Sequence, residues 1–91
     1  MTVEHELLAL RELHDVVERA AQDLERIAGD LDRAVGVELW TGRQADELRS
    51  VWLAQRRVVR PTLTSVLRAS AADVRTQHNN LAAAVGRSER L

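Results

Sequence analysis

Histidine and carboxylate side chains are the groups in this chain whose chemistry could support catalysis or metal binding. His5 and His14 are nine positions apart, which on a helix places them on nearly the same face but about 13 Å apart along the axis. That separation is too large for one metal ion, and His78 is distant in sequence. Asp46 and Glu47 are adjacent, so on a helix their side chains diverge by about 100° rather than act together as acid and base. We predict no metal site, no cofactor and no enzymatic activity.

Other nucleophile and phosphate-binding chemistry lacks the residues it needs. Cysteine is absent, which excludes disulfides, zinc–thiolate sites and thiol catalysis. The chain has no Gly-x-Ser-x-Gly nucleophile motif and no glycine-rich phosphate loop. A basic stretch could bind nucleic acid, but the net charge of −1 and the lack of interleaved aromatic side chains favour a solvated or salt-bridged helix face. The arginines of this stretch are Arg49, Arg56, Arg57, Arg60 and Arg68.

Charge is distributed unevenly between the two halves of the chain. Residues 1–40 contain ten acidic residues and four arginines, whereas residues 41–91 contain four acidic residues and nine arginines. Two such halves attract each other when they lie side by side, although exposed ion pairs add little stability. We therefore expect a hairpin of complementary charge, with a chance asymmetry of solvated faces as the alternative.

Apolar residues recur at helical spacing through the first part of the chain and predict a helix over about 3–35. Thr2 is the expected N-cap, and Gly36 is the expected C-terminal stop. The apolar stripe is wider than one helix contact requires, and its third column contains small residues that allow a close approach. The columns are Val3, Leu10, Val17, Leu24 and Leu31; Leu13, Ala20, Ile27 and Ala34; and Leu7, His14, Ala21, Ala28 and Val35.

A turn over about 36–41 is expected to precede a second helix over about 42–85. Thr41 and Gln44 have the spacing of a capping box, and Gly42 would occupy the first helical position and let Trp40 fold back. A frayed segment is expected after Gly86. Pro61 either kinks the second helix or ends it, in which case a third helix begins there; the absence of a good N-cap before Pro61 favours the kink.

The two tryptophans have different expected roles. Trp52 falls within the apolar pattern of the second helix and is expected in the core. Trp40 lies at the turn, where it could cover the end of a helical bundle, be presented for recognition, or do both.

A single domain of 91 residues built largely from Leu, Val, Ile and Ala has a thin core. We expect an all-α, antiparallel helix-turn-helix hairpin whose stability depends on an additional surface. The residues expected at the helix-bundle or dimer interface are Leu10, Leu13, Val17, Leu24, Ile27, Leu31, Leu48, Trp52, Val59, Leu63 and Val66.

Trp40-Thr41-Gly42, placed between two long helical segments in a chain of 91 residues, resembles the WXG family of small Esx or ESAT-like type VII secretion proteins. The resemblance covers essentially the whole chain. It implies a hairpin that pairs with a second copy, with a sister WXG-type protein or with the helical leader domain of a larger effector. The product would be an elongated four-helix bundle exported by the type VII machinery.

One departure from that family concerns the export signal. Family members or their partners often carry a C-terminal Tyr-x-x-x-Asp/Glu signal, but this chain has no tyrosine, and Ala82 stands four residues after His78. The resemblance thus implies the signal-less half of a heterodimer or a small chaperone.

The expected location is the cytoplasm before export and the cell surface or medium afterwards, because no signal peptide and no apolar run long enough for a membrane span occur. The alternatives are a cytoplasmic adaptor or antitoxin-like protein that is not exported and, third, a coiled coil associated with nucleic acid.

Overall fold

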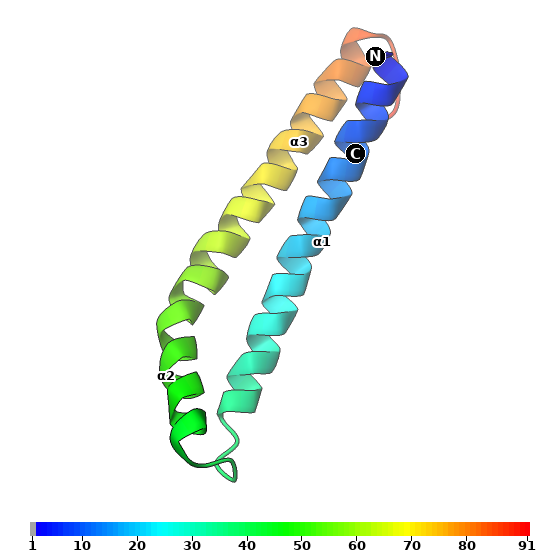
Figure 1. Ribbon diagram of the computed structural model, residues 1–91. Coiled ribbons are helices and arrows are strands. Elements are labelled where there is room, and N and C mark those ends of the chain that lie inside the picture. Colours follow the sequence, from blue (N-terminus) through cyan, green and yellow to red (C-terminus); the bar gives the residue numbers. More distant parts are fainter. Residues whose placement is uncertain (1) are drawn as a thin grey trace.

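Two antiparallel helical arms form the molecule. The computed structural model describes residues 2–91. Helix α1 (Val3–Val35) makes the first arm; α2 (Arg43–Val58), a π-helical turn η1 (Val59–Leu63) and α3 (Thr64–Ala84) make the second. Figure 1 shows the arms side by side, with the turn at one end and both termini near the other. The predicted all-α hairpin is confirmed.

The hairpin is long and thin. It measures 62 × 20 × 17 Å, and its radius of gyration is 19.1 Å, against about 12 Å for a compact domain of this length. Its accessible surface is 6442 Å², about 1,100 Å² more than the roughly 5,300 Å² of a compact protein of the same mass. Two arms alone therefore leave much surface uncovered.

Helix α1 begins and ends at the predicted residues. The Thr2 hydroxyl accepts a hydrogen bond from the backbone N–H of His5 at 3.2 Å, and Glu4 and Glu6 in the first turn favour the positive end of the helix dipole. Gly36 is the C-cap, and its backbone N–H donates to carbonyls of the last turn. The predicted span of about 3–35 is confirmed.

The second arm continues through Pro61 in one π-helical turn. The residues that face α1 are spaced by seven up to Val59 and again from Thr64 onward, and the step of five between them is the extra residue of a π turn. Pro61 has no backbone N–H to donate, and the wider π turn accommodates this missing hydrogen bond. The Thr64 hydroxyl donates to the Val59 carbonyl oxygen at 3.1 Å. The arm bends at this point in Figure 1, so the expectation of a kink is confirmed over that of a separate third helix.

Small side chains form the seam between the arms. The third apolar column of α1 faces the second arm, and alanine dominates on both sides, which permits close approach. Trp52 is the large aromatic residue in the seam and is 7% exposed, so its predicted core position is confirmed. The buried residues are Leu7, Ala21, Ala28, Ala45, Trp52, Thr64, Ala71, His78 and Ala82.

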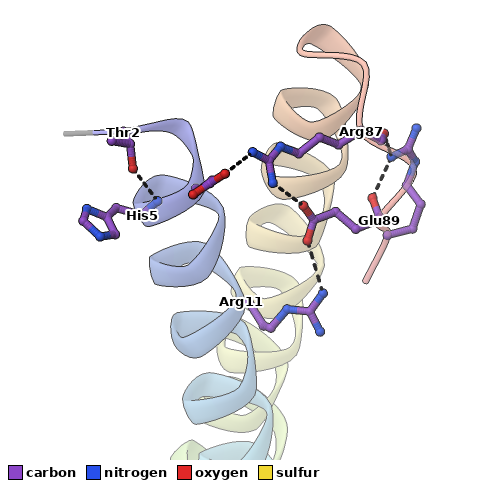
Figure 2. A network of polar contacts seen from close by, with 7 residues as sticks. Thr2, His5, Arg11, Arg87 and Glu89 are labelled. Carbon is purple, nitrogen blue, oxygen red and sulfur yellow. Dashed lines mark hydrogen bonds and ion pairs between the residues drawn. The ribbon is translucent and has the colours of Figure 1, made fainter.

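The segment after α3 folds back against α1, contrary to the predicted fraying. Gly86 has a positive φ of 74°, and the backbone N–H groups of Gly86 and Arg87 donate to the carbonyls of Ala83 and Ala82, a Schellman ending. Arg87 then pairs with Glu4 at 2.7 Å, and Figure 2 shows Arg87, Glu89 and Arg11 joined in one polar chain. The hydrogen bond with Glu4 raises the pKa of the Arg87 guanidinium. Contacts between distant charges, which sequence periodicity does not reveal, hold this tail.

Candidate functional site

The turn motif lies at the tip of the hairpin, but its capping differs from the prediction. Helix α2 begins at Arg43, and Gly42 rather than Thr41 is its N-cap, with no side-chain cap bond. The predicted Thr41–Gln44 capping box is therefore wrong. Gly42 has a φ of 111°, which a side chain rarely tolerates, and a Cβ there would meet nothing within 4 Å. Glycine is needed for its backbone conformation and not to make space for Trp40.

Arg49 holds the turn together. Its Nε donates to the Val35 carbonyl oxygen at 2.7 Å, and one terminal nitrogen donates to the carbonyls of Val37 and Trp40 at 2.8 and 2.7 Å. Its guanidinium carbon also lies 5.7 Å from the centre of the Trp40 ring, within cation–π range. The sequence reasoning grouped Arg49 with the basic stretch and missed this role. The signal was the unsatisfied carbonyls that every helix leaves at its C-terminal end, here that of α1.

The tip exposes apolar side chains beside this arginine. Leu39 is 95% exposed and Trp40 is 40% exposed. Trp40 thus has one part of its ring close to Arg49 and presents the rest to solvent.

The residues that flank the seam differ in chemistry between the two sides of the hairpin. A residue three positions after a seam residue lies to one side of it, and a residue four positions after lies to the other, because a turn takes 3.6 residues. Ala21 is followed by Leu24 and Glu25 in these positions, and Ala71 by Val74 and Arg75. Since the arms are antiparallel, equal offsets on both arms lie on the same side of the hairpin.

One side of the hairpin is therefore largely apolar, although Gln44, Ser70 and Gln77 also stand one position before a seam residue. Just outside the half-buried leucines and valines runs a column of exposed residues, each one position before a seam residue; Ile27 is 44% exposed and Leu63 is 42% exposed. We call this surface the apolar face. Its exposed residues are Leu13 and Ile27 on α1 and Val51, Val58 and Leu63 on the second arm. The half-buried Ala20 lies in the same column, and the face is bordered by the half-buried Leu10, Val17, Leu24, Leu31, Leu48, Val59, Leu67, Val74 and Leu81.

The predicted interface residues divide into four groups in the structure. Trp52 is buried in the seam, and Leu13, Ile27 and Leu63 lie exposed on the apolar face. Val66 is exposed farther out on α3. The half-buried residues, Leu10, Val17, Leu24, Leu31, Leu48 and Val59, border both the seam and the apolar face.

The opposite side of the hairpin carries the ion pairs between the arms. Arg68 pairs with Glu25 at 2.7 Å, and Arg60 and Arg56 reach Asp32 at 2.6 and 3.5 Å. The acidic first half thus pairs with the basic second half, as the uneven charge predicts. We call this side the ion-paired face.

Asp32 connects the ion-paired face to the seam. Its Oδ1 accepts a hydrogen bond of 2.7 Å from the Trp52 indole N–H. That hydrogen bond, together with Arg56 and Arg60, lowers the pKa of Asp32, although burial opposes the shift. Sequence reasoning missed Asp32; the signal was an acid four positions after the seam residue Ala28, matched by arginines four positions after seam residues on the other arm.

The histidines lie apart from any ligand cluster. Within residues 2–91, no three histidine, aspartate or glutamate side chains come together as a metal site requires. His14 lies beside Asp15 and Glu18 at the edge of a shallow hollow of about 150 Å³ that is also lined by Arg68 and Arg75. His78 is fully buried in the seam, with its Nδ1 3.0 Å from the Asn79 Oδ1.

Comparison of the chain with protein-family models, with curated proteins and with solved structures finds no match. Among residues 2–91, no helix is both long enough and apolar enough to cross a membrane. The geometry of the apolar face and of the Trp40 turn is thus the basis for a functional assignment.

Proposed function

We propose that this protein acts by helix–helix association, as a secreted or co-secreted partner, effector or chaperone of a type VII secretion system. The single observation that carries the proposal is the placement of large apolar side chains. Ile27, Leu63 and Val58 are exposed on one face, while the buried seam is built mostly of alanine. Exposed apolar side chains gathered along one face mark an interaction surface.

The occupant that fits this face is a second helical hairpin. The face includes residues of both arms of a hairpin that is 62 Å long and at most 20 Å wide, and two hairpins stacked on such faces make a four-helix bundle. The excess accessible surface of about 1,100 Å² is larger than the roughly 800 Å² that each partner contributes to a specific protein–protein interface. The partner would be a second copy, a sister protein of WXG type or the helical leader domain of a larger effector.

The type VII assignment rests on the tip of the hairpin. Trp40 and Gly42 stand at the turn between the arms, the position that the WXG resemblance requires, and Trp40 is partly exposed there. Because the chain has no tyrosine, a Tyr-x-x-x-Asp/Glu export signal would come from the partner.

Pairing is tested by tagging the chain in the cell from which it comes and isolating its complexes. Ile27→Glu should abolish co-purification of a helical partner, because a carboxylate would be buried in the apolar contact. Glu12→Gln, on the outer side of the same helix, is the matched control and should leave the partner bound. Equal recovery of the partner with Ile27→Glu would refute the apolar face as the binding surface.

Export is tested by following the tagged chain in cells with an active or an inactivated type VII ATPase. The chain should reach the medium or cell surface only when the ATPase is active, and Trp40→Ala should reduce export without preventing pairing. Normal export of Trp40→Ala would remove the recognition role of the tryptophan. A chain confined to the cytoplasm while the machine is active would instead support a cytoplasmic adaptor.

A further inference from the structure

Charged residues around the apolar face are of one sign. The outer border of the face is formed by positions two after a seam residue, which on a helix lie just beyond the exposed apolar column. Asp23 and Asp30 occupy these positions on α1, and Glu47 and Asp73 occupy them on the second arm. Glu6 stands in the exposed column itself, one position before Leu7. We call these five exposed carboxylates the acidic rim.

Arginines lie elsewhere on the same helices. Those of the second arm that follow a seam residue by four positions point to the ion-paired face, where Arg56 and Arg68 meet acids of α1. Arg19, Arg26 and Arg43 each precede a seam residue by two positions, which places them on the outer side away from the apolar face. The side of the hairpin left for a partner is therefore acidic, although the chain as a whole is nearly neutral.

Part of the rim is neutralised within α1. Arg26 lies 3.6 Å from Asp23 and 3.9 Å from Asp30, and Arg33 also pairs with Asp30. Glu6, Glu47 and Asp73 have no ion pair among the described residues. These three carboxylates therefore dominate the electrostatics of the rim.

We propose, on the basis of the helix–helix function above, that the apolar face binds a helical hairpin whose apolar stripe is bordered by basic residues, and not a second copy of this chain. When two hairpins stack face to face, the border of one meets the border of the other. A second copy would bring carboxylates against carboxylates, which disfavours pairing, whereas lysines or arginines at those positions would attract the rim. The acidic rim thus selects among partners that the apolar face alone would bind equally.

A charge-reversed copy of the chain serves as the probe partner. The variant Glu6→Lys/Glu47→Lys/Asp73→Lys keeps the apolar face and changes the sign of the rim. Its matched control is Glu12→Lys/Asp15→Lys/Glu38→Lys, which changes the net charge equally but on exposed positions outside the rim. Sedimentation equilibrium would be measured on the wild-type chain, on each variant and on equimolar mixtures, at low and at high salt, against the 10.2 kDa mass of one chain.

The mixture of wild-type chain and rim variant should associate about ten-fold or more tightly than the wild-type chain alone at low salt, and high salt should narrow the difference. The mixture with the control variant should show a much smaller gain. A wild-type homodimer as tight as the mixed dimer, or an equal gain with the control variant, would overturn the proposal.

A second substitution separates failure of this proposal from failure of the proposed function. Ile27→Glu in both chains of the mixture should abolish the association. If the mixed dimer survives that change, the contact does not use the apolar face, and both proposals fall. If Ile27→Glu abolishes association but charge reversal has no effect, the apolar face stands as the interface and only the acidic rim loses its role.

Discussion

Ile27 and Ala28 are neighbours in the chain but lie in opposite environments in the fold. Ala28 is fully buried in the seam, while Ile27 is exposed on the apolar face, and the same contrast separates Leu13 from the half-buried His14 next to it. In most small domains the large apolar residues fill the core. Here the seam takes small side chains and the uncovered face keeps several large ones. The comparison teaches that the seam determines how the two arms meet, while the apolar face keeps its large side chains uncovered for the helix–helix contact that we propose.

The largest expected effect on stability comes from a substitution in the seam. Trp52→Ala should lower the free energy of unfolding by about 3–5 kcal/mol, because it removes the one large aromatic side chain of the seam. Trp40→Ala, at the exposed tip, should cost about 1 kcal/mol or less. Urea unfolding followed by far-ultraviolet circular dichroism measures both, and Trp52→Phe provides a milder variant that should still fold. If Trp52→Ala and Trp40→Ala lowered the free energy of unfolding equally, the contrast between a buried seam and an exposed tip would be contradicted.

A smaller effect is expected from enlarging the seam. Ala21→Leu should destabilise the hairpin by about 1–3 kcal/mol, because Ala21 is fully buried where the arms approach closely. Ala20→Leu, one position away at the apolar face, should change the stability by about 0.5 kcal/mol or less and should strengthen association with a partner. If both substitutions cost the same, the column that contains Ala21 is not the seam in solution.

Sequence periodicity is sufficient to predict much of this arrangement. The recurrence of Leu, Val and Ala predicts both long helical segments, and the small residues at Ala21 and Ala28 indicate where a close contact is possible. It does not say which of three adjacent columns faces the other arm, because all three are apolar. Asp32 and Arg56, which follow Ala28 and Trp52 by four positions, indicate the column that faces the other arm. Their opposite charges become informative only when the two arms are compared with each other.

The turn and the tail are less predictable for a different reason. Arg49 bonds to carbonyls that precede it by nine to fourteen residues, and Arg87 pairs with Glu4 across nearly the whole chain. Such contacts depend on the three-dimensional path and leave no local pattern. The positive φ of Gly42 likewise moves the start of α2 beyond the residues that local capping rules select.

Low pH should destabilise the hairpin by protonating Asp32, which connects the seam to the ion-paired face. The pKa of Asp32 is lowered in the folded chain, so its ionised carboxylate stabilises the fold above the ordinary pKa of an aspartate. This stabilisation is lost as the pH falls through the lowered pKa. Asp32→Asn should therefore be less stable than the wild-type chain at neutral pH and should lose less stability on acidification. Melting temperatures between neutral and strongly acidic pH measure the difference, with Asp30→Asn, on the acidic rim, as the control.

The smallest expected effect concerns the tail, which contacts the hairpin through exposed charges. Arg87→Ala removes the pair with Glu4 and the pair with Glu89, the second of which is shown in Figure 2, and exposed pairs contribute little. A small drop in melting temperature at low salt, absent at high salt, is expected. Arg90→Ala is the control, since Arg90 donates to the Arg87 and Glu89 carbonyl oxygens within the tail. Because this tail lies with Arg11 and Glu4 on the ion-paired side, neither substitution should alter association through the apolar face. A loss of association with Arg87→Ala would mean that the partner reaches beyond the apolar face to the tail.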